Sequence, residues 1–133
     1  MSIASAILLL AQVAGPPAPE VAATAEARAV RIGADGPELD ACGGVGRIGG
    51  PDELLVVRSG PDDRAAEADR LERRSFVWLC DSTGEWQGIV YPSGEFQDIA
   101  DCRVSGPVAQ VQAYDGPCRS GWVRARNIEL LTG

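Results

Sequence analysis

The stretch RSFVWLCDSTGEWQGIVY, residues 74–91, decides the fold of this chain. In residues 76–80 (FVWLC) the three side chains at even positions share one face and the two at odd positions share the other, as in a β-strand. Residues 81–85 (DSTGE) have the composition of a turn. Residues 86–91 (WQGIVY) form a second β-rich run, which ends at Pro92. The stretch therefore predicts a β-hairpin.

Short apolar runs separated by turn residues recur in the rest of the chain. Residues 54–58 (LLVVR) are rich in β-formers and end at Ser59-Gly60-Pro61. We expect further short strands within residues 39–48, 108–113, 121–123 and 127–131, and the 16 glycines and 9 prolines supply the turns between them. Five or six short strands predict an all-β fold, either a small barrel or a sandwich.

Residues 62–74 (DDRAAEADRLERR) conflict with this pattern. By intrinsic propensity the segment favours a helix that begins at an Asp. It has very little apolar area to bury, however, and helices in proteins depend on such burial. We therefore expect a long polar loop with one helical turn at most.

The chain has 133 residues, 45% of them apolar, and this length and composition indicate that it contains one globular domain. The net charge is -7, and every basic residue is Arg because the sequence contains neither Lys nor His. This balance argues against nucleic acid and against anionic membranes, which attract clustered cations. The lack of His removes the commonest general base and metal ligand. We expect no enzymatic activity, no metal and no cofactor.

The N-terminus resembles an export signal. Residues 3–14 (IASAILLLAQVA) form an apolar run, which proline residues interrupt from Pro16 onward. Ala23-Thr24-Ala25 fits an A-x-A cleavage site, and residues 21–23 offer a second one. No Lys or Arg precedes the run, and the alternative is a buried N-terminal helix. We expect a signal peptide at residues 1–25, a flexible leader at 26–37, a domain at 38–133, and a periplasmic or secreted location.

The four cysteines are Cys42, Cys80, Cys102 and Cys118. An even number suits an oxidising compartment, and the absence of a CxxC pair argues against zinc and redox sites. The sequence predicts two structural disulfides, for which three pairings are open.

Three runs together resemble a bacterial SH3-like (SH3b) domain. They are LLVVRSGP (residues 54–61), the pair RSFVWLCD and GEWQGIVY (74–81 and 84–91), and GWVRARNIELL (121–131). They follow the family's order and cover residues 54–131. The resemblance implies a small SH3-like barrel of five to six strands. It also implies that residues 62–74 are a long loop and the entry to a strand rather than a helix.

The family usually connects its central strands to the G-W-V element by a tight turn, whereas here residues 92–117 form a long insertion. The resemblance therefore implies that a Cys102–Cys118 disulfide staples this insertion. Cys42 then pairs with Cys80 and ties the N-terminal strand to the second strong strand. A subgroup of small exported SH3-like proteins carries such an insertion.

Motifs for other chemistry are weak. Residues 44–49 (GVGRIG) match G-x-G-x-x-G, but Gly50-Pro51 follows at once and no βαβ unit is predicted, so we read a Gly-rich turn. The carboxylates lack the spacing of a calcium loop and are interpreted as solvated surface. The serines have no His to activate them.

Aromatic residues are the remaining candidates for binding. On the resemblance, we expect Trp86, Tyr91 and Tyr114 to be partly exposed around a shallow groove with Arg119 as a nearby cation, and Trp122 to lie in the core. The sequence thus predicts a non-catalytic exported binding module for a peptidoglycan peptide or an envelope protein. The alternative is a small disulfided envelope inhibitor, or a structural protein, that acts on a lytic enzyme.

Overall fold

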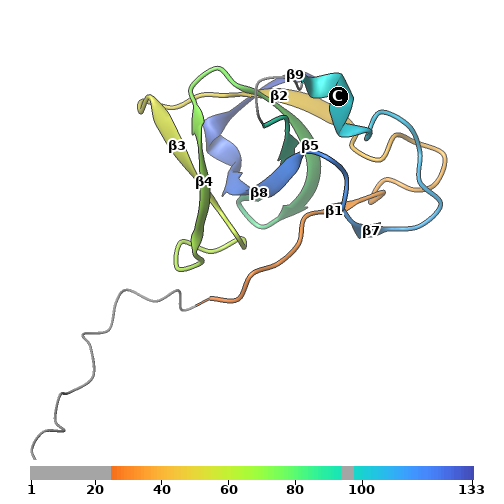
Figure 1. The fold of residues 1–133 in the computed structure, drawn as a ribbon, viewed down its shortest axis with the longest axis horizontal. Helices are drawn as coiled ribbons and strands as arrows, with labels where there is room; N and C mark the ends of the chain where they lie inside the picture. Colours follow the sequence, from red (N-terminus) through yellow and green to blue (C-terminus); the bar gives the residue numbers. More distant parts are fainter. Residues whose placement is uncertain (1–24, 94–97) are drawn as a thin grey trace, which may run out of the picture.

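The computed structural model describes residues 25–93 and 98–133 and is all-β (Figure 1). The expected signal peptide lies outside the described residues, apart from Ala25. The strands are β1 (Arg31–Ile32), β2 (Gly44–Ile48), β3 (Leu54–Arg58), β4 (Glu67–Glu72), β5 (Phe76–Thr83), β6 (Trp86–Tyr91), β7 (Gln112–Ala113), β8 (Arg119–Arg124) and β9 (Ile128–Thr132). Short 3₁₀ helices form at η2 (Ile99–Cys102) and η3 (Ala125–Asn127). Among the described residues, no helix is long and apolar enough to cross a membrane.

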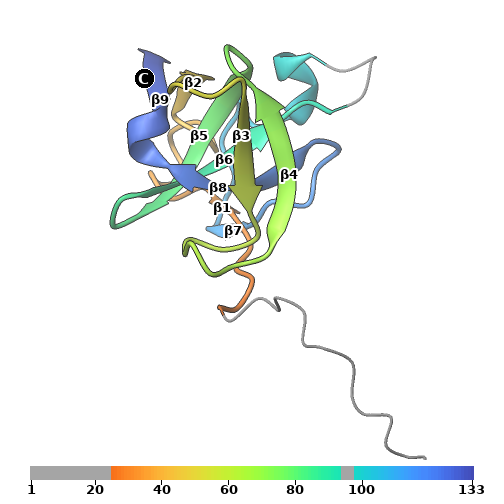
Figure 2. The same cartoon turned by 90° about the vertical axis from the view of Figure 1, so that its left-hand side faces the viewer.

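Within the described residues, seven strands form one antiparallel sheet in the order β4-β3-β8-β6-β5-β2-β9, and β1 pairs separately with β7. The predicted hairpin is confirmed, because β5 and β6 pair from Trp78 opposite Val90 to Thr83 opposite Trp86. Gly84 lies in its turn with a φ of 58°, which favours glycine. The sheet curls strongly (Figures 1 and 2), but its outermost strands β4 and β9 do not pair, so it is not closed.

The prediction of a polar loop at residues 62–74 is wrong in part. Residues 67–72 form β4, which pairs with β3 and places Leu71 opposite Leu55. Leu71 packs against the core, while most other β4 side chains are exposed and charged. An edge strand needs only one buried face, and exposed charges keep it from pairing with other chains. The small apolar area that disfavours a helix is therefore sufficient for an edge strand.

An inner core fills the concave side of the curled sheet. Its buried members are Ile48, Val57, Val77, Ile89, Tyr91 and Val123. They come from five strands and alternate with side chains that point to the opposite face. Gly121 on β8 lets that strand approach β3, because a Cβ at this position would collide with Val57.

An outer core covers the opposite face of the same sheet. Its buried members are Val30, Ile32, Ala41, Cys42, Cys80, Trp86, Val90, Cys102, Val104, Cys118 and Trp122. Trp122 is fully buried, as expected from the sequence. Its indole Nε1 donates a 2.8 Å hydrogen bond to the carbonyl oxygen of Arg28. The sheet is therefore buried on both faces, and the outer cover comes from segments outside the sheet.

Residues 26–37, expected to form a flexible leader ahead of the domain, supply part of this outer cover. Val30 and Ile32 are 2% and 6% exposed and pack in the same cluster as Trp122. The backbone N–H of Arg28 also donates to the carbonyl of Ser59 at 2.9 Å. Burial of two aliphatic side chains on an otherwise uncovered apolar face is sufficient to hold the segment in place.

Both expected disulfides are present, Cys42–Cys80 and Cys102–Cys118. All four cysteines belong to the outer core. Residues 98–117 of the insertion fold over this core, where η2 is capped by the side chain of Asp98. Of the strand expected within residues 108–113, only Gln112–Ala113 forms, and it pairs with β1. The two disulfides therefore hold in place the segments that cover the outer face of the sheet.

We expect Ile32→Ala to lower the free energy of unfolding by about 2–4 kcal/mol, because it leaves a cavity between the N-terminal segment and the sheet. Urea denaturation would measure this. The matched control is Leu39→Ala, at a residue that is 57% exposed, where a change within about 0.5 kcal/mol is expected. Equal effects of the two variants would contradict a packed N-terminal segment.

Replacement of both Cys102 and Cys118 by Ala should lower the free energy of unfolding by about 3 kcal/mol. The bond closes a sequence separation of 16 residues, and loss of a loop of this size releases about that much conformational entropy in the unfolded chain. Denaturant unfolding is the measurement, and its slope should rise because the unfolded chain exposes more surface without the bond. Mass spectrometry without reduction should find no free thiol in the parent chain, and a free thiol would contradict the assignment.

Candidate functional site

The four residues expected to form a binding groove do not form one site, although Tyr91 and Arg119 are cross-strand neighbours. Trp86 is only 9% exposed and Tyr91 only 1%, so the expectation that both are partly exposed is wrong. The guanidinium of Arg124 lies 4.5 Å from the centre of the Trp86 ring and covers it. Arg124 is held there by a 2.6 Å hydrogen bond to Asp63. Trp86 belongs to the outer core and Tyr91 to the inner core, on opposite faces of the sheet.

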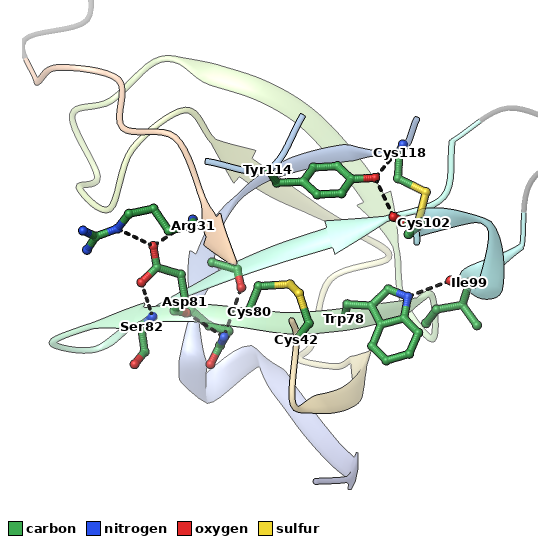
Figure 3. Close-up of a disulfide and its surroundings, with 12 residues drawn as sticks. Arg31, Cys42, Trp78, Cys80, Asp81, Ser82, Ile99, Cys102, Tyr114 and Cys118 are labelled. Atoms are coloured by element: carbon green, nitrogen blue, oxygen red, sulfur yellow. Dashed lines mark hydrogen bonds and ion pairs between the residues drawn. A yellow bond between two sulfur atoms is a disulfide. The ribbon is translucent and has the colours of Figure 1, made fainter. Parts of the chain in front are cut away.

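Tyr114 is half-buried and fastens the insertion. Its hydroxyl donates to the carbonyl oxygen of Cys102 at 3.0 Å and accepts from the backbone N–H of Cys118 at 2.9 Å (Figure 3). It therefore bridges the two halves of the Cys102–Cys118 staple. Burial raises the pKa of this hydroxyl. These contacts give Tyr114 a structural role in the insertion.

Arg119 is exposed and reaches Asp69, which is also the partner of Tyr91. The Tyr91 hydroxyl donates to Asp69 Oδ2 at 2.9 Å, and Arg119 Nη1 lies 3.4 Å from the same oxygen. Partial burial of Asp69 raises the pKa of its carboxyl group. Hydrogen bonds from the Arg70 backbone, Tyr91 and Arg119 lower it by more, so the pKa of Asp69 lies below its usual range. Burial and the Asp69 carboxylate raise the pKa of Tyr91. This cluster ties edge strand β4 to β6 and β8.

A concave site lies elsewhere, around Asp81 near the C-terminal end of β5. Among the described residues, Asp81 is the only buried charged side chain, at 7% exposure. Its position follows from a bulge, because the register between β5 and β6 shifts between Leu79 and Asp81. Gly88 lies opposite, and a Cβ there would come within 2.9 Å of Asp81 Cβ and 3.3 Å of the Trp122 ring. The glycine makes room for the carboxylate beside the outer core.

The Asp81 carboxylate binds the N-terminal segment (Figure 3). Oδ2 accepts the backbone N–H of Arg31 at 3.0 Å and lies 3.6 Å from Arg31 Nε and 3.9 Å from an Arg28 nitrogen. Oδ1 accepts the backbone N–H of Ser82 at 2.9 Å. The side-chain amide of Gln87 donates to the Asp81 carbonyl at 2.7 Å. These donors satisfy the hydrogen-bonding needs of a buried carboxylate, and through them Asp81 fixes the surrounding residues.

An open groove of about 510 Å³ lies beside this carboxylate, and we call it the Asp81 groove. Its polar lining comes from Arg31, Asp35, Asp81, Ser82 and Gln87. The remaining lining includes Gly43 and Gly44, Leu79, Cys80 and Leu130. The Cys42–Cys80 disulfide joins two sides of the groove. Its walls are therefore fixed by covalent and ionic links before a ligand binds.

The lining determines what the groove can do chemically. It presents a half-exposed guanidinium, an exposed carboxylate at Asp35 and an amide, so it can bind groups of both charges and neutral hydrogen-bonding groups. No cluster of three or more His, Cys, Asp or Glu suited to a metal occurs in the described part of the chain. The arrangement favours recognition of a short polar ligand.

Sequence reasoning missed Asp81 because it assigned residues 81–85 to a turn. The strand extends to Thr83 instead. The backbone donor at Arg31, which brings the N-terminal segment to Asp81, lies 50 positions away in the sequence. The one local signal is an Asp that directly follows a run of alternating apolar residues, and turns contain many such Asp residues.

Comparison of the chain with protein-family models, with curated proteins and with solved structures finds no match. The resemblance to SH3-like domains therefore stays a prediction from sequence.

Tyr91→Phe should destabilise the protein by about 1 kcal/mol near pH 7, because Asp69 loses a buried hydrogen-bond donor. Asp69 has a lowered pKa, so its contribution is complete above the unfolded pKa of about 4 and is lost as pH falls through the folded value. The difference between parent and variant should therefore shrink towards about pH 2. Urea denaturation at both pH values measures it, and a pH-independent difference would contradict the role of the ionised carboxylate.

Proposed function

We propose that this chain is an exported, non-catalytic binding module whose Asp81 groove binds a short polar segment of the cell wall, in particular a peptidoglycan peptide. The observation that carries the proposal is the groove itself. It is open, about 510 Å³ in volume, and bordered by a disulfide and by the hydrogen bonds of a buried carboxylate. A groove that needs no rearrangement loses little conformational entropy when a ligand binds.

The chemistry of the lining supports a peptide as the ligand. Peptidoglycan peptides carry carboxylates, amines and amides within a few ångströms of one another. Arg31 can bind a carboxylate, Asp35 an amine and Gln87 an amide. A purely apolar or a strongly anionic ligand would fit this mixture less well.

The fold proposed for the module is an SH3-like barrel. Three observations support it: the run at residues 54–61 contains β3, the central pair forms the β5–β6 hairpin, and the run at residues 121–131 spans most of β8, η3 and most of β9. The curl of the sheet around an inner core also fits a barrel (Figures 1 and 2). Export is supported by the apolar run of residues 3–14 and by two disulfides, which suit an oxidising compartment.

A second candidate function is the binding of a protein partner, such as a lytic enzyme that this chain inhibits or holds in place. Exposed apolar side chains on two strands favour it, namely Phe76 on β5 at 51% exposure and Leu130 on β9 at 63%. Strand β9 is also an edge of the sheet. An edge with exposed apolar side chains can pair with a strand of another protein.

Retention of the purified protein on isolated peptidoglycan tests the first proposal. We expect Arg31→Ala to weaken binding about tenfold, the effect of one charge-assisted hydrogen bond. The backbone N–H of Arg31 and the Arg28 guanidinium still lie beside Asp81 in this variant, but one ion pair to the buried carboxylate is lost, so binding is compared at a temperature where thermal melts show both variants to be folded. The matched control is Arg126→Ala, which removes the same charge from an exposed residue outside the groove.

Each outcome decides between the candidates. Loss of retention in Arg31→Ala but not in Arg126→Ala supports the groove. Equal loss in both variants shows a nonspecific effect of charge and contradicts it. No retention of the parent protein, together with stoichiometric binding to a peptidoglycan hydrolase, would favour the second candidate.

A further inference from the structure

A second hollow lies where the end of β2 meets the turn between β4 and β5. It measures about 370 Å³ and is lined by Arg47, Ile48, Gly49, Arg73, Arg74 and Glu129. We call it the Arg74 hollow. None of these residues lines the Asp81 groove. Three of its six lining residues are arginines and one is a glutamate, in a chain with a net charge of -7.

The backbone of Arg74 is strained at this position. Its φ is 80°, in the left-handed region that favours glycine. The turn needs that conformation, because the Arg74 N–H donates to the Ile48 carbonyl at 2.7 Å and the Ser75 N–H to the Glu72 carbonyl at 3.1 Å. A glycine would make the same bonds without steric cost, so folding alone gives no reason for a large side chain here.

Contacts within the protein do not account for the Arg74 side chain either. Its guanidinium makes no hydrogen bond or ion pair with any residue that the structure describes. Arg73 donates to the Pro51 carbonyl at 3.3 Å and likewise has no carboxylate within 4 Å in the described part of the chain. Arg47 pairs with Glu129, both partly exposed. Two of the three guanidiniums are thus available for an external anion, and the third can exchange its partner.

We propose that the Arg74 hollow binds a phosphate group. Arginine forms paired hydrogen bonds with phosphate oxygens, and three arginines that line one hollow supply enough donors for a tetrahedral anion. The hollow is also partly enclosed by the paired strands and the turn, which raises the strength of charged hydrogen bonds above that on a flat surface. The group can belong to a soluble phosphate compound or to the headgroup of a phospholipid. This site is independent of the function proposed for the Asp81 groove.

Arg74→Gly tests the proposal without a loss of folding, since glycine is favoured at this φ. Addition of inorganic phosphate to the ¹⁵N-labelled protein should shift the backbone amide signals of residues 47–49 and 73–75 in a saturable manner. We expect Arg74→Gly to weaken this binding at least about tenfold and to leave the melting temperature within a few degrees. Arg103→Gly is the matched control, because Arg103 also has a left-handed backbone, with a φ of 62°, and lies outside the hollow.

Cosedimentation with vesicles distinguishes the two sources of phosphate. Binding to phosphatidylglycerol vesicles but not to phosphatidylcholine vesicles, lost in Arg74→Gly, assigns the site to an anionic headgroup. Saturable binding of inorganic phosphate without vesicle binding assigns it to a soluble compound. The proposal is overturned if inorganic phosphate does not shift the amide signals of residues 47–49 and 73–75 and the protein does not bind phosphatidylglycerol vesicles. It is also overturned if Arg74→Gly binds phosphate as tightly as the parent and the Arg103→Gly control do.

Discussion

Burial of the Trp122 indole is the constraint on which the rest of the structure depends. Trp122 lies on β8, near the middle of the sheet, and points to the outer face. A ring of this size needs an apolar cover and a partner for its N–H. The N-terminal segment provides both, through Val30, Ile32 and the Arg28 carbonyl. Once this segment lies on the sheet, Asp81 has cations beside it, and the groove forms at the segment's edge.

The disulfides extend the same cover. Cys80 is the bulged residue of β5 and joins Cys42, which precedes β2, so one staple lies directly beside the Asp81 groove. The other staple closes the insertion, and Tyr114 and Trp78 fasten that insertion by hydrogen bonds to the Cys102 and Ile99 carbonyls (Figure 3). Short strands and loops bury little area by themselves, which is why a small domain gains from covalent links.

Local pattern predicted the elements well and the exposure of side chains poorly. Alternation in residues 76–80 and the turn after it correctly gave the β5–β6 hairpin. The resemblance to SH3-like domains led us to expect Trp86 and Tyr91 to be partly exposed. The local pattern could not correct this, because it does not show that both faces of β6 are covered, with Trp86 on the outer face and Tyr91 on the inner face. Their burial depends on Arg124 and on the inner core, which are contributed by distant segments. Asp81 was missed for the same reason.

The two candidate sites lie at opposite ends of the β2–β9 pair and rest on different parts of the fold. Gly44 borders the Asp81 groove and Ile48 the Arg74 hollow, a separation of about 13 Å along a strand. The groove depends on the N-terminal segment and on the Cys42–Cys80 staple, both of which belong to the outer cover. The hollow depends only on the sheet and on the turn between β4 and β5. Because a strand pair is stiff along its length, the two sites keep a fixed spacing even though separate contacts build them.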